Sequence, residues 1–512
     1  MLKIFIYALI IAAALLTAWK TFLEKPESQK KQFAWFLGFL STIILLVVST
    51  LTLPSNSNKQ QLKLSQEIKA KQDSLVSSLP EIVSETLLTK LQELGISPPK
   101  TFEEIRKSIG KTCPEIGQAI CDKLRNATEA LNSGRDDEAE QSYKALVEIF
   151  SDVAELRFNL ALAYQDQRKI DKAKREYREA LRLQPSLVEA RNNLGCLLMG
   201  QKKYPEAEKE FREAIRINPE LYSAHLNLGT LLVYLNKYPE AENEYRLAVK
   251  INPNDELAHN NLGGLLCKLK RYTEAEKELR EAITINPNYY MGHYNLGVLL
   301  DDLKKYSEAE KEYREAIRIN PEYDSAHHAL GILLYDLKRY PEAEKEYREA
   351  IRINPNDADK HYNLGNLLYD LKRYPEAERE YREAIKINPD CVDAHNNLGV
   401  LLKKLKRYTE AEKEYTEALR INPDHDNAHD NLGNLLYELK RYPEAEKEYK
   451  EAIKINPKNA EAHLNLGNLY YVIEKKEDAK NELKKAINLF TEQGEQEMVK
   501  ACNELLKLLE SD

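Results

Sequence analysis

The stretch that decides the fold is DSAHHALGILLYDLKRYPEAEKEYREAIRINPND, residues 324–357. Small and apolar residues recur at helical spacing in both halves: Ala326, Leu330, Leu333 and Leu334 in the first, then Ala343, Tyr347, Ala350 and Ile351 in the second. Residues three and four apart share one side of an α-helix. The segment therefore predicts two antiparallel helices joined by a short turn at residues 338–340.

The same unit returns every 34 residues along most of the chain. Prolines stand at 185, 219, 253, 287, 321, 355, 389, 423 and 457, and glycines at 195, 229, 263, 297, 331, 365, 399, 433 and 467. A fixed period of this length is typical of a repeat array, in which each unit packs mainly on its neighbours. The chain is therefore predicted to be an array of helical hairpins.

The punctuating residues have mechanical roles. Gly331, Ala343 and Ala350 are small, which lets neighbouring helices approach closely. Pro341 is predicted to begin the second helix, where its missing N–H costs little, and Pro355 ends the unit.

Three units lack the proline that begins the second helix. Thr273, Ser307 or Thr409 stands in its place, and Glu276, Glu310 or Glu412 follows three residues later. This spacing predicts a capping box, in which hydroxyl and carboxylate satisfy the free N–H groups of the helix start.

These residues resemble the tetratricopeptide repeat, with leucine and glycine at positions 7 and 8, alanines at 20 and 27, an aromatic at 24 and proline at 32. Nine units over 188–493 carry the glycine, unit 154–187 has Ala161 instead, and unit 120–153 is degenerate. The family's tryptophan at position 4 is replaced by His or Arg. The resemblance implies an all-α, right-handed solenoid of about eleven repeats, with a repeat array over 120–493 and a capping helix over 494–512.

The N-terminal part has a different composition. Residues 4–19 and 33–53 are uncharged and apolar, and a helix needs about 20 such residues to span a membrane. We predict a membrane anchor over 1–53, built from two transmembrane helices, followed by a helical stalk or linker over 54–119. If residues 1–18 are instead a cleaved signal, the chain is single-pass. Positive charges favour a multi-pass protein with a cytoplasmic array.

The sequence offers little for catalysis. Charged residues make up 31% of the 512, and the net charge is only −8, so a nucleic-acid-binding surface is not expected. Eight of the ten histidines stand at position 4 of successive repeats, roughly 8–10 Å or more apart, too far to share one metal ion. We interpret them as packing residues, and we predict no enzyme, no metal and no cofactor.

Position 6 of the repeat is nearly always asparagine. The members of this column are Asn159, Asn193, Asn227, Asn261, Asn295, Asn363, Asn397, Asn431 and Asn465, and Ala329 interrupts it. The array is similar to the superhelical repeat domain of the O-linked N-acetylglucosamine transferases, and this resemblance implies that an asparagine ladder binds a peptide backbone. The alternative is that asparagine here is family consensus with a structural role.

The other positions that the family points into its concave groove vary along the chain. Acidic residues (Asp301, Asp302, Asp336, Asp370, Glu438) alternate with tyrosines (Tyr294, Tyr335, Tyr362, Tyr369, Tyr437), and Lys268, Lys403 and Lys404 interrupt them. We predict that the asparagine column with Tyr335, Tyr369, Asp336 and Asp370 forms a peptide-binding site. An extended ligand with basic and aromatic character suits this lining.

Three functions remain open at this stage. The first is a membrane-anchored scaffold or adaptor that binds other proteins or peptides in its groove. The second is a structural role, in which the array assembles with itself or with components of the cell envelope, and the third is a subunit that recruits substrates for a separate enzyme. The sequence does not identify the partners or the oligomeric state.

Overall fold

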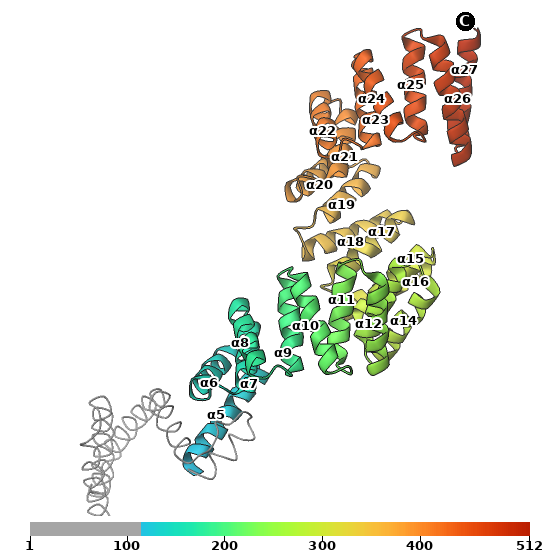
Figure 1. Ribbon diagram of the computed structural model, residues 1–512. Helices are drawn as coiled ribbons and strands as arrows, with labels where there is room; N and C mark the ends of the chain where they lie inside the picture. The colour runs from blue at the N-terminus through green and yellow to red at the C-terminus, as the bar shows by residue number, and fades with distance from the viewer. Residues whose placement is uncertain (1–113, 512) are drawn as a thin grey trace, which may run out of the picture. The chain divides into compact units, whose positions relative to one another are not determined.

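The computed structural model describes residues 114–511, and every regular element in that range is an α-helix (Figure 1). No helix within the described range is long and apolar enough to cross a membrane. The predicted spans at 4–19 and 33–53 lie outside these residues, as does nearly all of the predicted stalk over 54–119.

The helices belong to two units, and the first ends at Pro185. Its described part contains α5 (Pro114–Asn132), α6 (Asp136–Ile149), α7 (Ala154–Asp166) and α8 (Ile170–Leu183). Helix α5 packs on α6, α6 on α7, and α7 on α8.

The second unit, from Ser186, holds nine helical hairpins. Their first helices are α9 (Val188–Gly200), α11 (Tyr222–Tyr234), α13 (Glu256–Lys268), α15 (Tyr290–Asp302), α17 (Asp324–Asp336), α19 (Ala358–Asp370), α21 (Val392–Lys404), α23 (Asp426–Glu438) and α25 (Ala460–Val472). Their second helices are α10 (Tyr204–Ile217), α12 (Tyr238–Ile251), α14 (Tyr272–Ile285), α16 (Tyr306–Ile319), α18 (Tyr340–Ile353), α20 (Tyr374–Ile387), α22 (Tyr408–Ile421), α24 (Tyr442–Ile455) and α26 (Lys476–Gln493).

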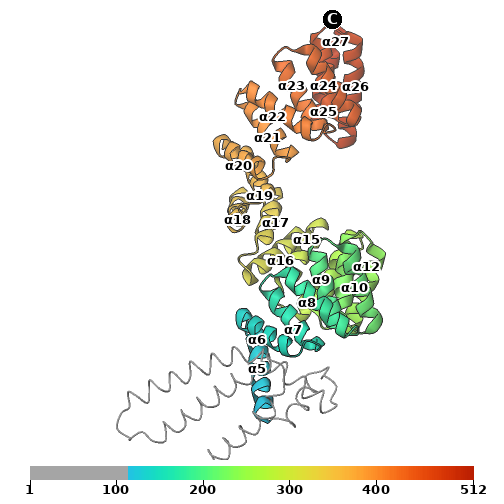
Figure 2. The ribbon, with the colours of Figure 1, turned by 60° about the vertical axis from the view of Figure 1, so that its left-hand side comes forward.

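The hairpins of the second unit stack in chain order (Figure 2). Each second helix packs on the first helix of the next hairpin, and from α9 to α25 the first helices of neighbouring hairpins also contact each other. A last helix, α27 (Gln496–Ser511), packs on α26. The first helices therefore form one continuous row.

The two helices of a hairpin pack closely where the aromatic ring of the second helix meets the glycine of the first. The Tyr347 ring is 2% exposed and lies against Gly331, where an added Cβ would be 2.7 Å from ring atom Cδ1. Burying a large apolar side chain stabilises a fold by about 1.5–3 kcal/mol. The prediction that small residues permit a close approach is confirmed, because only glycine leaves room for this ring.

The turn between the two helices contains a feature that the sequence did not predict. Lys338 has φ 58°, in the left-handed region. Its N–H donates to the Tyr335 carbonyl at 2.8 Å, and the Arg339 N–H donates to that of Leu334 at 2.8 Å. A residue of positive φ recurs in each hairpin from Arg168 to Glu474, and none of these residues is glycine.

The second helices begin as predicted where proline is present, since Pro341 lies in the first turn of α18. The predicted capping box is wrong. Helix α14 begins at Tyr272, so Thr273 already lies inside it, and the N-cap residue Arg271 makes no side-chain cap hydrogen bond. The Arg271 guanidinium bonds the first-turn Glu274 instead, at 2.7 Å.

Candidate functional site

The row of first helices carries the predicted binding residues. We use the term first-helix face for the side chains at positions 5, 6, 9, 12 and 13 of these helices in the second unit. The position-6 asparagines are half-buried there, and most of them donate across to the preceding hairpin. The bonds from Nδ2 are Asn227 to Asn192 Oδ1 (2.9 Å), Asn295 to Asn260 Oδ1 (2.8 Å), Asn397 to Asn366 Oδ1 (2.9 Å), Asn431 to Asn396 Oδ1 (3.0 Å) and Asn465 to Asp430 Oδ1 (3.0 Å).

These bonds show that the asparagine column ties one hairpin to the next. Asn193 and Asn261 accept from the asparagine before them at 3.3 and 3.4 Å, and Asn159 lies in the first unit beside Tyr143. An amide has two N–H donors and a carbonyl acceptor. In Asn227 and Asn295 no described residue donates to Oδ1, so that atom faces no internal partner.

The interruption of the column at Ala329 is bridged by other residues. Asn363 Nδ2 lies 2.9 Å from His328 Nε2, and burial together with Lys360 lowers the pKa of His328, which keeps that nitrogen an acceptor. The Lys360 ammonium is almost completely buried between Asp324, at 2.8 Å, and Asp357. Lysine replaces the usual small residue here, and this was the only sequence signal of the buried pair.

The phenols at position 24 reach the first-helix face from behind. Tyr245, Tyr381 and Tyr449 donate to the position-9 residues Thr230, Asn366 and Asn434 at 3.1, 2.8 and 2.8 Å. In three hairpins position 9 is Val298, Ile332 or Val400 instead.

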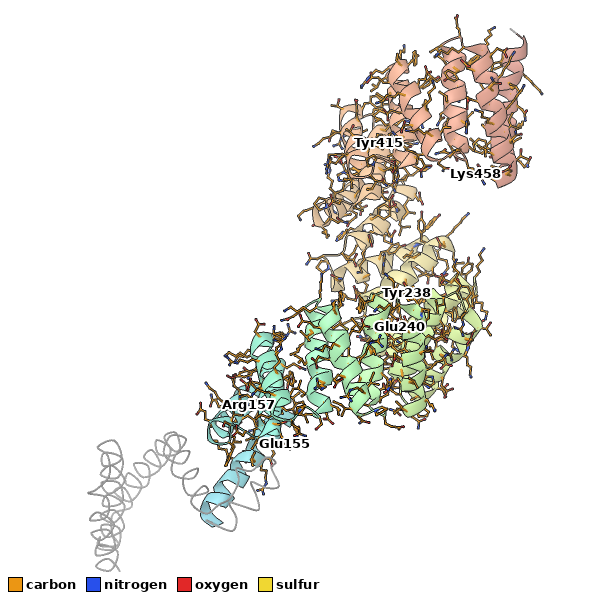
Figure 3. The ribbon with its side chains drawn as sticks, viewed as in Figure 1. Glu155, Arg157, Tyr238, Glu240, Tyr415 and Lys458 are labelled. Atoms are coloured by element: carbon orange, nitrogen blue, oxygen red, sulfur yellow. The ribbon has the colours of Figure 1, made fainter. Side chains whose placement is uncertain are left out.

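In those three hairpins the phenol has no such partner. The Tyr415 hydroxyl is buried and has no hydrogen bond with any described residue. Its side chain is labelled in Figure 3. Tyr313 and Tyr347 are each 2% exposed. Burial is the main cause that raises the pKa of each phenol, and the charge of a nearby carboxylate, Asp301 for Tyr313 and Asp336 for Tyr347, raises it further. Buried hydroxyls are normally hydrogen-bonded, so the Tyr415 hydroxyl is an exception.

Side chains at positions 12 and 13 meet where neighbouring first helices end. Tyr335 donates its hydroxyl to Asp370 Oδ2 at 2.5 Å, and the Lys403 ammonium pairs with Glu438 Oε1 at 3.1 Å. In both contacts position 12 of one hairpin reaches position 13 of the next. The predicted residues Tyr335 and Asp370 are thus brought together, and the Tyr369 ring packs at a tilt against Tyr374 with ring centroids 5.7 Å apart.

Two of the predicted groove tyrosines belong to the packing. Tyr294 lies against Tyr313 and Tyr323, with centroids 6.1 and 5.3 Å away. Tyr362 lies 6.3 Å from Tyr381 and accepts a hydrogen bond from Asn397. Both are half-buried at position 5, and they support the face from inside.

The opposite side of the second unit, which we term the second-helix side, carries a ladder of ion pairs. Glu310 Oε1 accepts from Arg314 at 2.8 Å, and its Oε2 accepts from Arg339 of the next hairpin at 2.7 Å. The equivalent carboxylates that bond a cation of the next hairpin are Glu208, Glu242, Glu276, Glu344, Glu378, Glu412 and Glu446. On this side the chain neutralises its own charges.

The histidine column has a specific structural role. His327 Nδ1 lies 2.6 Å from Glu346 Oε2, and its Nε2 lies 3.1 Å from the Pro321 carbonyl oxygen. The same two contacts recur at His225, His259, His293, His361, His395, His429 and His463. Each histidine therefore joins both helices of its hairpin to the preceding turn.

A first-unit residue indicates the charge state of these histidines. Arg157, at the equivalent position, donates to Glu176 at 2.7 Å and to the Ser151 carbonyl at 3.1 Å (Figure 3). Arginine is always protonated, and a histidine can donate to both acceptors only as imidazolium. The pKa of His259 is accordingly raised, first by its bond to Glu278, which outweighs burial.

Neither a metal-ligand cluster nor the pocket between α18, α19 and α20 gives a competing site in residues 114–511. Within this range no group of three His, Cys, Asp or Glu residues could hold a metal ion. A pocket between α18, α19 and α20 is lined by Arg348, Arg352, Arg379 and His361. These cations already bond Glu344, Glu349, Glu380 and other carboxylates, which argues against an anion site.

The fold and this face define a class of protein: an array of helical hairpins that serves as a scaffold for protein–protein interaction. Models of the TPR repeat match residues 333–372 and 433–472, and models of the tetratricopeptide repeat match 158–221, 226–290, 290–323, 362–426 and 460–492. The chain belongs to the tetratricopeptide-repeat family, whose repeats are generally non-catalytic.

Comparison with other proteins adds only a general likeness. No curated protein sequence matches the chain. Yeast Tom70 is similar at 15% identity and a TM-score of 0.39, covering 77% of this chain and 96% of its own. YrrB, a TPR protein with an unusual peptide-binding site, is similar at 22% identity and a TM-score of 0.32, covering 36% and 95%. PilF of Pseudomonas aeruginosa is similar at 25% identity and a TM-score of 0.36, covering 42% and 94%. TM-scores this low support no further conclusion.

Proposed function

We propose that this protein is a membrane-anchored adaptor that binds extended segments of other proteins along its first-helix face. The array would wind into a right-handed solenoid with this face lining the concave groove. The predicted transmembrane helices at 4–19 and 33–53 would hold it at the membrane, with the array in the cytoplasm.

One observation carries the proposal: on the first-helix face the Oδ1 atoms of Asn227 and Asn295 accept no hydrogen bond from any described residue. A peptide backbone supplies both donors and acceptors at regular intervals, so an extended segment could satisfy these atoms without being read by its side chains. On the second-helix side, by contrast, the carboxylates described above have cationic partners.

The sharpest test places a photo-reactive probe on each side of the array. The amino acid p-benzoylphenylalanine would replace Ile332, which is 37% exposed on α17, in the full-length chain. A matched control carries the probe at the exposed Lys345 of α18. We expect partner proteins to cross-link at position 332 and not at 345. Cross-linking from position 345 alone, or from neither, would contradict the proposal.

Replacement of the asparagines is a less clean test than the sequence suggested. Asn227 and Asn295 donate to neighbouring hairpins, so alanine there removes structural bonds as well as any ligand contact. A change of Asn227, Asn261 and Asn295 to Ala is therefore informative only together with a measured unfolding curve.

A further inference from the structure

Position 12 of each first helix faces position 13 of the next, and at one such pair both residues are acidic. At Lys403 and Glu438 a cation meets a carboxylate, and at Tyr335 and Asp370 a phenol meets a carboxylate. The equivalent residues one hairpin before Tyr335 are Asp301 of α15 and Asp336 of α17. Two acidic side chains are thus paired by the register of the array, whereas the Tyr335–Asp370 and Lys403–Glu438 contacts pair complementary groups.

The described residues supply no cation for this step. No ion pair joins Asp301, Asp302 or Asp336 to a lysine or arginine of the described range. Lys305, three residues beyond Asp302, bonds Glu276 at 3.2 Å instead. Burial raises the pKa of the Asp301 carboxyl, and the charges of Asp336 and Asp302 raise it further. Like charges held close together destabilise a fold, so this arrangement has a cost that a ligand could offset.

A second group near these carboxylates also has no hydrogen-bond partner among the described residues. The Tyr313 side chain of α16 is 2% exposed. Val298 occupies position 9, where Thr230, Asn366 and Asn434 accept a hydrogen bond from the tyrosine of their own hairpins. Asp301 and Asp302 are among the charges that act on this phenol. The hydroxyl therefore reaches the first-helix face beside the carboxylates, where it can donate to a carbonyl of a bound chain.

We propose that Asp301, Asp302 and Asp336 bind an arginine or lysine side chain of an extended partner segment, while the Tyr313 hydroxyl donates to that segment's backbone. This inference rests on the proposed function and names the chemistry of its ligand. The ligand's cation takes the place that Lys403 fills in the contact with Glu438. The partner is therefore a basic extended peptide.

The test compares two fluorescent peptides with the full-length chain in a non-ionic detergent. One is a Gly-Ser peptide with arginine at every third position, and the other has the neutral isostere citrulline at the same positions. We expect the arginine peptide to bind about tenfold more tightly, the scale of one charge-assisted pair. Added salt should reduce that preference. Equal affinities would overturn the inference.

Two variants of the site make the test specific. The double variant Asp301→Asn/Asp336→Asn should lose the preference for arginine, while its affinity for the citrulline peptide stays unchanged. Asp301→Lys should lose it too, because the new ammonium would pair with Asp336 as Lys403 pairs with Glu438. Circular dichroism verifies that both variants fold, and a retained preference in either would overturn the inference.

A control with the same change of net charge excludes a long-range effect. Glu310→Gln/Glu344→Gln removes two charges from the second-helix side and should leave the preference for arginine intact. Loss of the preference in this control would also overturn the inference. If the citrulline peptide cross-links at position 332 but arginine brings no gain, only the ligand's charge is wrong. If neither peptide cross-links there, the proposed function fails as well.

Discussion

The two sides of the second unit differ in how their charged side chains are paired. On the second-helix side Glu310 and its equivalents each bond a cation of the next hairpin, and the histidines below them are bonded at both nitrogens. On the first-helix face Asp301 and Asp336 lie at paired positions without a cation of the described range, and the Oδ1 atoms of Asn227 and Asn295 accept from no described residue. The second-helix side is therefore held together by ion pairs, whereas the first-helix face combines asparagine bonds between hairpins with carboxylates that have no cationic partner among the described residues.

The largest expected effect comes from the contact that joins the two sides. Gly331→Ala would place a Cβ 2.7 Å from the Tyr347 ring, and overpacking of this kind costs about 1–3 kcal/mol. The control is Gly264→Ala, also within a first helix, where an added Cβ meets no atom within 4 Å. It should gain up to about 1 kcal/mol in helix propensity. Urea unfolding measures both, and equal shifts would contradict the packing described here.

The second prediction concerns pH. The raised pKa of His259 means that its stabilisation is complete below the unfolded value of 6.5 and is lost as pH rises through the folded pKa. The bond to His259 lowers the pKa of Glu278, whose stabilisation is present above 4.5 and is lost as pH falls through its folded pKa. The melting temperature should therefore be highest between about pH 4.5 and pH 6.5.

A variant of the histidine column isolates this effect. With all eight position-4 histidines changed to Arg, as in Arg157, the pairs stay charged at any ordinary pH. The fall in melting temperature between pH 6 and 8 should then disappear. If the variant and the natural chain follow the same pH profile, the histidines do not carry the dependence.

The third prediction concerns the left-handed turn. Lys338→Gly should raise the free energy of unfolding by up to about 1 kcal/mol, because glycine adopts φ 58° without steric cost. Lys345→Gly, at an exposed position inside α18, should lower it by about 1 kcal/mol. Loss of stability in both variants would show that the turn stores no strain.

The smallest expected effects come from neutralising one carboxylate on each side, which should change stability in opposite directions. Asp336→Asn relieves repulsion and should raise stability by a few tenths of a kcal/mol, up to about 0.5. Glu344→Gln breaks partly exposed pairs with Arg348 and Arg373 and should lower it by about 0.2–1 kcal/mol. Thermal unfolding at low salt gives both signs, and shifts in the same direction would remove the contrast between the sides.

Much of the fold can be predicted from the sequence because the same glycine, aromatic and proline positions recur every 34 residues. Glycine at position 8 and the aromatic residue at position 24 predict the packing that Gly331 and Tyr347 show. The left-handed turn was missed because Lys338 and its equivalents are not glycine, the usual signal for positive φ. The second-helix starts without proline were misread because the hydroxyl residue lies one position inside the helix.

The candidate site was less predictable because its contacts join residues far apart in sequence. The bond from Asn295 to Asn260 spans 35 residues, and nothing local distinguishes a bridging asparagine from one that binds a ligand. The glutamates that bond the histidines lie in charged runs: Glu346 is buried, whereas Glu344, two residues earlier, is half-exposed. The best available signal was Arg157 at the histidine position, which indicates a paired cation.

Hydrogen–deuterium exchange of the full-length chain, with and without the arginine peptide, tests the central contrast most directly. Bound peptide should slow exchange in α15, α17 and α19, and leave the second helices α16, α18 and α20 less changed. Slower exchange confined to the second helices, or none on any helix while the peptide is bound, would contradict this account.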